Sequence, residues 1–315
     1  MAQGWLLVTL APFVVAAATA AASGRLSQDR PTFSAESELV VLHVTVSTKK
    51  GQYVGGLRQE AFRIFEEGRP QTIRLFTSED APVTVGLLID SSGSMQGNRD
   101  LVAAAAAAFV QSSNASDEVF ALTFDDFVRS ALPESAPFTS DPAALRDALF
   151  RRMSTRGRTA LYDAIASGVD YFSRGRYERK VLIVVSDGGD NASHIGFDPI
   201  LARIEASNVV IYAVGLIDPL EEDANPKRLK QLARVSGGEA YFPRDVGQVA
   251  DVLQRISRDI RSAYTMGYAP SDTPSGEAFR RIRVVAGVPG QSVVVRTRAG
   301  YLAGRHRAAD ESHVR

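Results

Sequence analysis

Four continuous apolar runs constrain the fold of this chain more than any other sequence feature. Each run is short and rich in Val, Ile and Leu, and the runs occupy Val83–Ile89, Val119–Phe124, Val181–Val185 and Val209–Val214. Strands that are apolar on both faces belong to parallel sheets covered by helices on both sides, whereas half-exposed strands alternate apolar and polar residues. The runs therefore predict a mostly parallel, buried sheet.

Helical patterns separate these runs. An alanine-rich segment from about Asn98 is the first, and further segments with helical spacing cover Pro142–Arg152, Thr159 to about Phe172, and Val246–Arg261. Alternation of buried strands with helices is typical of doubly wound α/β folds, in which helices cover both faces of the sheet. We therefore predict an α/β class domain over residues 82–262.

Short-strand patterns lie on both sides of this α/β block. Strand-like segments precede it at 39–47, 62–65 and 72–76, and others follow it at 264–268, 281–285 and 292–298. Neither flank alone holds enough strands for a stable sheet. We expect a single small β-domain, made from residues 36–78 and 264–303 and interrupted by the α/β domain. The alternative is two separate β-elements, whose strands would not pair with each other.

The two ends of the chain differ from the rest. Residues 1–22 form an apolar stretch that ends in small residues such as Ala18-Thr19-Ala20, a pattern typical of an export signal, although basic residues at its start are missing. An uncleaved N-terminal anchor is the alternative, and it would be the chain's only membrane contact. Residues 23–35 are a predicted linker, and 304–315 a predicted flexible tail. Both interpretations of residues 1–22 predict an extracytoplasmic protein that is secreted, periplasmic or on the cell surface.

Composition excludes several classes of function. The 315 residues include no cysteine, which excludes disulfides, thiolate metal sites and cysteine nucleophiles. Lys and Arg total 36, as do Asp and Glu, so the formal net charge is zero. This balance argues against a nucleic-acid partner.

Oxygen-bearing side chains gather where the strands of the predicted sheet end. Asp90, Ser92 and Ser94 follow the first apolar run, Asp187 follows the third, and Thr159 opens a predicted helix. In doubly wound sheets, the loops at the carboxyl ends of the strands form the binding site. Two carboxylates and three hydroxyls suit hard cations, with Mg²⁺ as the expected ion and Mn²⁺ or Ca²⁺ as alternatives, and they offer zinc none of its preferred ligands.

The order of these residues resembles a known family. Asp-x-Ser-x-Ser at 90–94, Gly-x-Thr-Ala-Leu at 157–161 and Ser-Asp-Gly at 186–188 are similar to the metal-ion-dependent adhesion site (MIDAS) of von Willebrand factor type A (VWA) domains. The resemblance covers about residues 82–262. The flanks, at 62–73, 265–268 and 298–301, resemble the exported bacterial group of VWA-related acidobacterial-type proteins.

The resemblance implies a fold, a metal site and a function. The fold would be Rossmann-like with one antiparallel edge strand, here expected at 128–132. The metal ligands would be Asp90, Ser92, Ser94, Thr159 and Asp187. The function would be non-enzymatic binding or adhesion to a protein partner, whose Asp or Glu completes the coordination of the divalent cation.

Several residues near the predicted site have two interpretations. Asp190 could support the metal ligands, but we favour a local turn. Asp125 and Asp126 could rim the site or lie in a solvated turn. Arg156 and Arg158 could attract an acidic partner or be ordinary solvated residues.

Two other functions are weighed against adhesion. A metal-dependent hydrolase needs a general base near the metal, and His194 is the one histidine close in sequence to Asp187. The chain also lacks the short motifs of serine hydrolases, zinc proteases and P-loop enzymes. An envelope scaffold with a structural metal is the stronger alternative.

Overall fold

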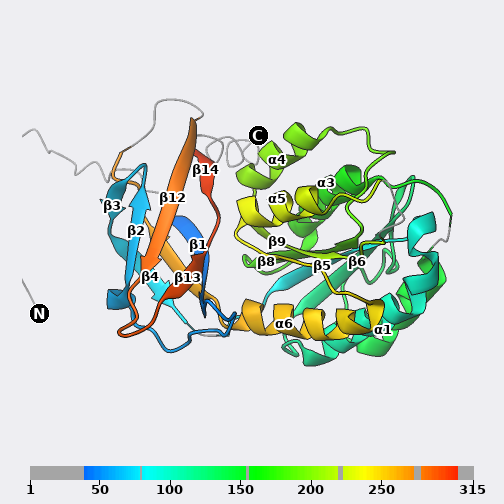
Figure 1. Ribbon diagram of the computed structural model, residues 1–315, viewed down its shortest axis with the longest axis horizontal. Helices are drawn as coiled ribbons and strands as arrows, with labels where there is room; N and C mark the ends of the chain where they lie inside the picture. Colours follow the sequence, from blue (N-terminus) through cyan, green and yellow to red (C-terminus); the bar gives the residue numbers. More distant parts are fainter. Residues whose placement is uncertain (1–38, 79, 154–155, 219–222, 273–277, 304–315) are drawn as a thin grey trace, which may run out of the picture. The chain divides into compact units, whose positions relative to one another are not determined.

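A six-stranded sheet lies at the centre of the α/β part of the chain. The computed structural model describes residues 39–78, 80–153, 156–218, 223–272 and 278–303 (Figure 1). The sheet order is β10-β9-β8-β5-β6-β7, and all neighbours are parallel except β6 and β7. Its strands are β5 (Thr84–Asp90), β6 (Glu118–Phe124), β7 (Val128–Ser130), β8 (Lys180–Ser186), β9 (Val209–Gly215) and β10 (Ala240–Tyr241).

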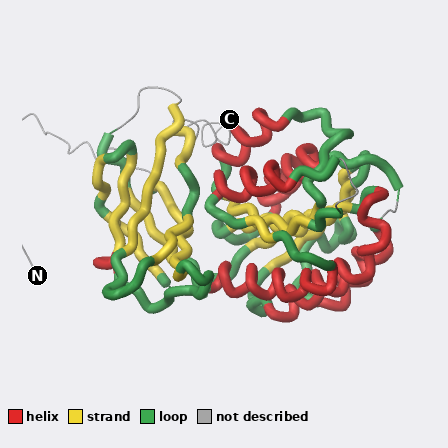
Figure 2. Tube along the Cα trace, in the orientation of Figure 1, coloured by secondary structure: helices red, strands yellow, loops and turns green. Residues whose placement is uncertain are grey.

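Helices cover both faces of this sheet (Figures 1 and 2). One layer contains α1 (Arg99–Ser112), α2 (Pro142–Arg152) and α6 (Val249–Arg261). The opposite layer contains α3 (Leu161–Tyr171), α4 (Phe197–Ala206) and α5 (Pro226–Ser236). Short 3₁₀ turns occupy Gln59–Ala61, Gly93–Asn98, Phe172–Arg174 and Val246–Gln248.

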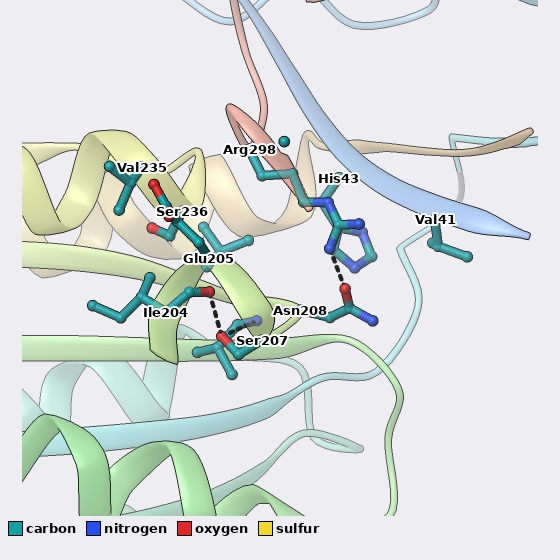
Figure 3. Close-up of a pocket in the computed structure, with 12 residues that line it drawn as sticks. Val41, His43, Ile204, Glu205, Ser207, Asn208, Val235, Ser236 and Arg298 are labelled. Atoms are coloured by element: carbon teal, nitrogen blue, oxygen red, sulfur yellow. Dashed lines mark hydrogen bonds between the residues drawn. The ribbon is translucent and has the colours of Figure 1, made fainter. Parts of the chain in front are cut away.

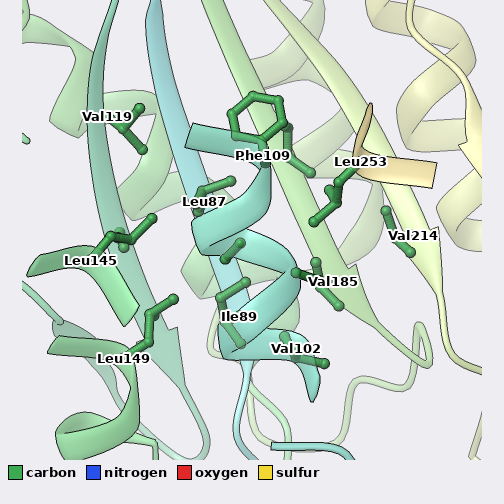
Figure 4. Close-up of a cluster of buried hydrophobic side chains, with 14 of the residues drawn as sticks. Leu87, Ile89, Val102, Phe109, Val119, Leu145, Leu149, Val185, Val214 and Leu253 are labelled. Carbon is green, nitrogen blue, oxygen red and sulfur yellow. The ribbon is translucent and has the colours of Figure 1, made fainter. Parts of the chain in front are cut away.

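Each layer packs its own apolar core against the sheet. Under α1, α2 and α6, side chains such as Leu87, Phe109 and Leu253 are fully buried (Figure 4). The other face holds Leu88, Ile165 and Leu182, among others. Gly86 in β5 lets this second core approach the strand, because a Cβ there would lie 2.4 Å from the Phe120 ring. Burial on both faces explains why the strands of this sheet are apolar throughout.

The two flanks of the chain pair with each other in two four-stranded antiparallel sheets. The sheet orders are β13-β1-β11-β4 and β14-β12-β2-β3, so each sheet mixes strands from before and after the α/β part. One apolar cluster, which includes Leu42, Ile64, Tyr264 and Val284, joins both sheets. The strands are β1 (Val40–Thr48), β2 (Phe62–Glu66), β3 (Arg69–Gln71), β4 (Ile73–Thr77), β11 (Tyr264–Tyr268), β12 (Ala278–Ala286), β13 (Val293–Arg296) and β14 (Gly300–Ala303).

The predicted fold class, a doubly wound sheet inserted between flanking β-structure, is confirmed. The antiparallel edge strand is β7, at Val128–Ser130. Sequence patterns did not predict α4 and α5, nor the short strands β3, β10 and β14. The described residues, which lie between 39 and 303, belong to one compact unit. The predicted export signal or anchor, the linker and the tail lie outside the described residues, and within the described part no helix is long and apolar enough to cross a membrane.

Candidate metal centre

The five predicted ligands lie at the carboxyl edge of the central sheet. Asp90 is the last residue of β5, and Asp187 follows the adjacent parallel strand β8. Ser92 and Ser94 lie in the loop after β5, and Thr159 lies just before α3. Parallel neighbouring strands end on the same side, so residues 97 positions apart in sequence come together here.

Asp90 is completely buried and held by two hydrogen bonds. The Ser92 amide donates to Oδ1 at 3.0 Å, and the Ser186 hydroxyl donates to Oδ2 at 2.7 Å. Burial raises the pKa of Asp90 to about 6, and the negative charge of Asp187 adds to the rise, while the hydrogen bonds oppose it. The protein alone therefore stabilises the ionised form of Asp90 poorly.

A chain of hydroxyl contacts connects the other residues of the loop to Asp187. The Ser92 and Ser94 hydroxyls are 3.2 Å apart, and Ser94 Oγ donates to Asp187 Oδ2 at 2.9 Å. Asp187 is 6% exposed, and its Oδ1 accepts the Gly189 amide at 2.8 Å. These contacts bring Asp90, Ser92, Ser94 and Asp187 into one cluster.

Thr159 joins this cluster through its loop. The Gly93 amide donates to the Gly157 carbonyl at 3.3 Å, which connects the loop of the two serines to the loop of Thr159. Gly157 has a φ of 106°, a left-handed value that favours glycine. Thr159 is 6% exposed, and Asn191 fixes it by accepting its amide proton at 2.9 Å.

The charge balance of the cluster fits a cation. Asp90 and Asp187 are both buried, and neither forms an ion pair with Lys, Arg or His in the part of the chain that the structure describes. Buried charges in proteins are normally paired or bound to a metal. Across the same residues, no three His, Asp or Glu side chains form a ligand cluster. A cation here would therefore need the hydroxyl oxygens as well as the carboxylates.

The rim of the cluster is a hairpin tip tied to the Thr159 loop. Asp125 is 4% exposed, and Arg129 Nη1 lies 2.8 Å from each of its carboxylate oxygens. The Asp125 carbonyl accepts the Ala160 amide at 2.9 Å. Asp126 accepts the Arg158 amide at 3.1 Å and Arg158 Nε at 3.0 Å, and these hydrogen bonds lower the pKa of Asp126. The charge of Arg158 is thus balanced within the rim.

Asp190 and His194 have local roles. Asp190 accepts the Tyr162 amide at 3.2 Å and the Ser193 hydroxyl at 2.5 Å, as expected for a residue that holds a turn and the start of α3. His194 Nδ1 lies 2.8 Å from the Asp163 carboxylate. Neither residue contacts the four-residue cluster through a described hydrogen bond.

Two residues that support the cluster were not predicted. Ser186 donates to Asp90 and accepts the Gly188 amide at 3.0 Å, and Asn191 positions Thr159. Ser186 was visible in the sequence as the residue before Asp187, but a serine that ends a buried strand has no distinctive pattern. The position of Asn191 beside Thr159 depends on the packing of two distant loops.

Comparisons with known proteins agree with this architecture. The family model described as von Willebrand factor type A domain matches residues 85–255. A search of curated proteins finds no significant match. Among solved structures, a von Willebrand factor type A protein from Catenulispora acidiphila is similar with a TM-score of 0.50 and 16% identity, over 85% of this chain and 75% of that one.

Two further structures are similar over a smaller share of this chain. An aerotolerance-related membrane protein from Bacteroides fragilis gives a TM-score of 0.46 and 18% identity, over 56% of this chain and 98% of that one. The von Willebrand domain of the type V pili tip protein Mfa5 from Porphyromonas gingivalis gives 0.44 and 15%, over 57% and 95%.

The matched family is one of binding modules. Its members are typically involved in protein interaction or adhesion, and they are usually not catalytic. The family model spans most of the central sheet, from β5 to α6, and the fold around it is that of the family. The chain therefore belongs to the von Willebrand factor type A domain family.

Proposed function

We propose that this protein is an exported, metal-dependent protein-binding module. A divalent cation, Mg²⁺ in preference to Mn²⁺ or Ca²⁺, would be held by Asp90, Ser92, Ser94, Thr159 and Asp187. An Asp or Glu of a protein partner would complete its coordination. The flanking segments support placing the chain in the exported bacterial group of VWA-related acidobacterial-type proteins.

One observation carries the proposal: two buried carboxylates, Asp90 and Asp187, share a cluster with serine hydroxyls and lack a basic partner among the described residues. An unpaired buried charge is costly, and a cation would remove that cost. Two carboxylates only neutralise a divalent ion, while hydroxyls contribute no charge. The bound ion would therefore still attract a carboxylate from a partner.

Metal binding is the first test. Mg²⁺ and Mn²⁺ are titrated calorimetrically into the chelated protein, with Asp90→Asn and Asp187→Asn as site variants. Asp198→Asn is the matched control, because Asp198 is an exposed aspartate at the start of α4. We expect saturable binding in the wild type and the control, and its loss in both site variants. A folded wild type that binds neither ion would contradict the metal site.

Partner chemistry needs a second test. Peptides from a random display library are selected on the immobilised protein with Mg²⁺ and released with a chelator. We expect enrichment of Asp or Glu, and no enrichment on Asp187→Asn. The scaffold alternative predicts a different pattern, in which Asp187→Asn lowers the melting temperature and no acidic peptides are enriched.

A hydrolase remains the weakest alternative. Among the described histidines, His194 is the one close in sequence to Asp187, and its imidazole contacts Asp163 rather than the cluster. A general base must reach the proton that it abstracts. The geometry therefore favours binding over catalysis.

A further inference from the structure

A second polar cavity lies away from the candidate metal centre, between the turn that follows β1 and helix α6. Its volume is about 250 Å³. The side chains that define its charge are Lys49, Lys50, Tyr53, Glu239, Arg255 and Arg296. Four of these six residues are basic and one is acidic, so the lining is strongly cationic.

The single carboxylate of the lining is already engaged. Arg296 forms an ion pair with Glu239 and a second one with Asp259, whose carboxylate lies 2.6 Å from Arg296 Nη2. The Tyr241 hydroxyl also donates to Glu239 Oε2 at 2.9 Å. Arg296 therefore shares one positive charge between two carboxylates, and this group keeps one negative charge. Against it stand the three positive charges of Lys49, Lys50 and Arg255, so the cavity remains cationic overall.

Arg255 is fixed beside the cavity without a counter-ion. Its guanidinium lies over the Tyr241 ring, 5.1 Å from the centroid, and close to Gly51, where a Cβ would come within 2.5 Å of Nη2. The Arg255 Nε atom is buried and lacks a hydrogen-bond partner, and among the described residues Arg255 forms no ion pair. A buried donor without an acceptor is a destabilising feature that a ligand oxygen would relieve.

Lys49 and Lys50 lie at the tip of the turn on the same cavity. Both are exposed, and the turn is closed by a hydrogen bond from the Gly51 amide to the Thr48 carbonyl at 2.9 Å. A second bond, from the Gln52 amide to Thr48 Oγ1 at 3.2 Å, holds the same turn. Neither lysine forms an ion pair with another described residue. The cavity therefore carries three cations that form no ion pair with another residue in the described part of the chain.

We propose that this cavity binds a phosphate group. A phosphate carries up to two negative charges near neutral pH and several acceptor oxygens, which match one guanidinium and two ammonium groups. The cavity is large enough for a phosphate together with part of the molecule that bears it. The site does not depend on the candidate metal centre, and it involves none of that centre's residues.

The test is a calorimetric titration of inorganic phosphate into the full chain, with a chelator present and at constant ionic strength. Chloride replaces phosphate in the reference titration. The variants are Lys49→Gln/Lys50→Gln and Arg255→Gln, and Lys227→Gln on α5 is the control that removes one exposed positive charge elsewhere. A further variant, Asp187→Asn, shows whether phosphate binds at the candidate metal centre instead.

We expect saturable phosphate binding in the wild type, Lys227→Gln and Asp187→Asn. The double lysine variant and Arg255→Gln should each bind at least about tenfold more weakly, since hydrogen bonds to charged groups contribute about 1.5–3 kcal/mol. Because both lysines are exposed, the double variant should keep the wild-type melting temperature even if Arg255→Gln does not. Absence of saturable binding, or equal binding by the double lysine variant, would overturn the proposal.

Titration with glycerol phosphate and with phosphatidic acid vesicles separates the sources of the phosphate. A soluble phosphate ester that competes with inorganic phosphate supports a small metabolite as the ligand. Binding to the vesicles that the double lysine variant loses supports a lipid headgroup. Vesicle binding that persists in that variant would place the lipid contact elsewhere and contradict a headgroup in this cavity.

Discussion

Asp90 is a buried carboxylate whose charged form the protein alone stabilises poorly, and this predicts how the metal-free protein responds to pH. Its pKa is raised to about 6 in the folded state, mainly by burial, from an ordinary value of 3.8. The folded state therefore holds a proton more tightly than the unfolded state. The resulting destabilisation is present above pH 6 and disappears as the pH falls from 6 towards 4.

In chelated protein we expect Asp90→Asn to raise the free energy of unfolding at pH 7.5 by about 2 kcal/mol. The amide retains the shape of the side chain but carries no charge. Urea unfolding at pH 7.5 and pH 5 with a chelator measures the effect, which should shrink at the lower pH. If Asp90→Asn were instead less stable than the wild type at pH 7.5, Asp90 would be stabilised by contacts other than a cation.

The surroundings of His43 lead us to expect the opposite pH dependence of stability. Its ring lines a narrow cavity beside Arg298 and Asn208, which hydrogen-bond to each other (Figure 3). Burial, together with the positive charges of Arg179 and Arg298, lowers the pKa of His43 from 6.5 to about 3. The unfolded state binds the proton first as the pH falls, so the neutral histidine costs stability between about pH 6 and pH 3.

We therefore expect His43→Gln to reduce the loss of stability on acidification. The wild type should lose about 1 kcal/mol more than the variant for each pH unit below about 6, after allowance for partial exposure of the ring. Thermal melts at several pH values between 7 and 4.5 measure the difference, with a chelator present so that the candidate metal centre contributes equally. Parallel curves for the two proteins would show that His43 has the same pKa in the folded and unfolded states, which would contradict the expected effect of burial.

At the scale of single residues, sequence patterns indicated which residues the candidate metal centre brings together and their order along the chain, but not the contacts that support them. Asp90 and Asp187 stand out because each follows an apolar strand, which is a local signal. Ser186 and Asn191 carry no such signal, because their roles depend on which loops meet at the sheet edge. The pairing of Arg158 with Asp126 is also a contact between distant segments, so sequence could not decide whether its charge was free.

The loop that follows β8 contacts the start of α5, and this contact shows how one element positions another at the site. Gly188 follows Asp187 with a φ of 85°, and a Cβ there would lie 2.6 Å from the Asn225 carbonyl. Asn225 in turn caps α5 by accepting the Arg228 amide, and its own amide donates to the Asp187 carbonyl at 3.1 Å. The start of α5 therefore fixes the backbone of Asp187.

We expect Gly188→Ala to destabilise the protein by about 1–3 kcal/mol and to weaken Mg²⁺ binding. The added Cβ would need both a left-handed backbone and a displaced helix start. Chemical unfolding and metal calorimetry measure the two effects. Gly55→Ala is the control, because no atom lies within 4 Å of a Cβ at that position and its φ is not left-handed; an equal effect of both substitutions would exclude the proposed steric cause.

At the scale of elements, the helices and strands with strong patterns were predicted and the weaker ones were missed. The predicted segments at 142–152 and 209–214 lie within one residue of α2 and β9. α5 has an Asn cap at 225, a proline at its first position and Gly237 after its end, which are helix boundary signals that could have identified it. α4 has Pro199 in its first turn, which interrupts the helical pattern.

At the scale of the whole molecule, the pairing of the two flanks follows from a simple constraint. The sequence shows three strand patterns on each flank, whereas the structure gives each flank four strands and interleaves the two sets, with β1 between β11 and β13. The sequence could predict that the two flanks would pair with each other, because this prediction depends only on the number of strand patterns in each flank. It could not predict that they would form two sheets, because register between distant strands depends on packing rather than on local pattern.

A buried ion pair connects these flanking sheets to the α/β part. Arg296 of β13 contacts Asp259 of α6, with side-chain exposures of 17% and 0%. Removing one partner of a buried pair leaves the other charge without compensation, at a cost of about 3–5 kcal/mol. By contrast, the pair of Arg69 and Asp272 is exposed, at 67% and 52%, and such surface pairs contribute little.

We therefore expect Arg296→Met to destabilise the protein by about 3 kcal/mol, and Arg69→Met to leave its stability unchanged. Because Arg296 joins two parts of the chain, its loss should also separate their unfolding, which differential scanning calorimetry would record as two transitions in place of one. The double variant Arg296→Met/Asp259→Leu replaces both charges by apolar groups and should recover much of the lost stability. If the double variant recovers stability but still shows two transitions, the ion pair couples the two parts. If it recovers stability with a single transition, apolar contact is enough to couple them, and the role of Arg296 is to compensate the charge of Asp259.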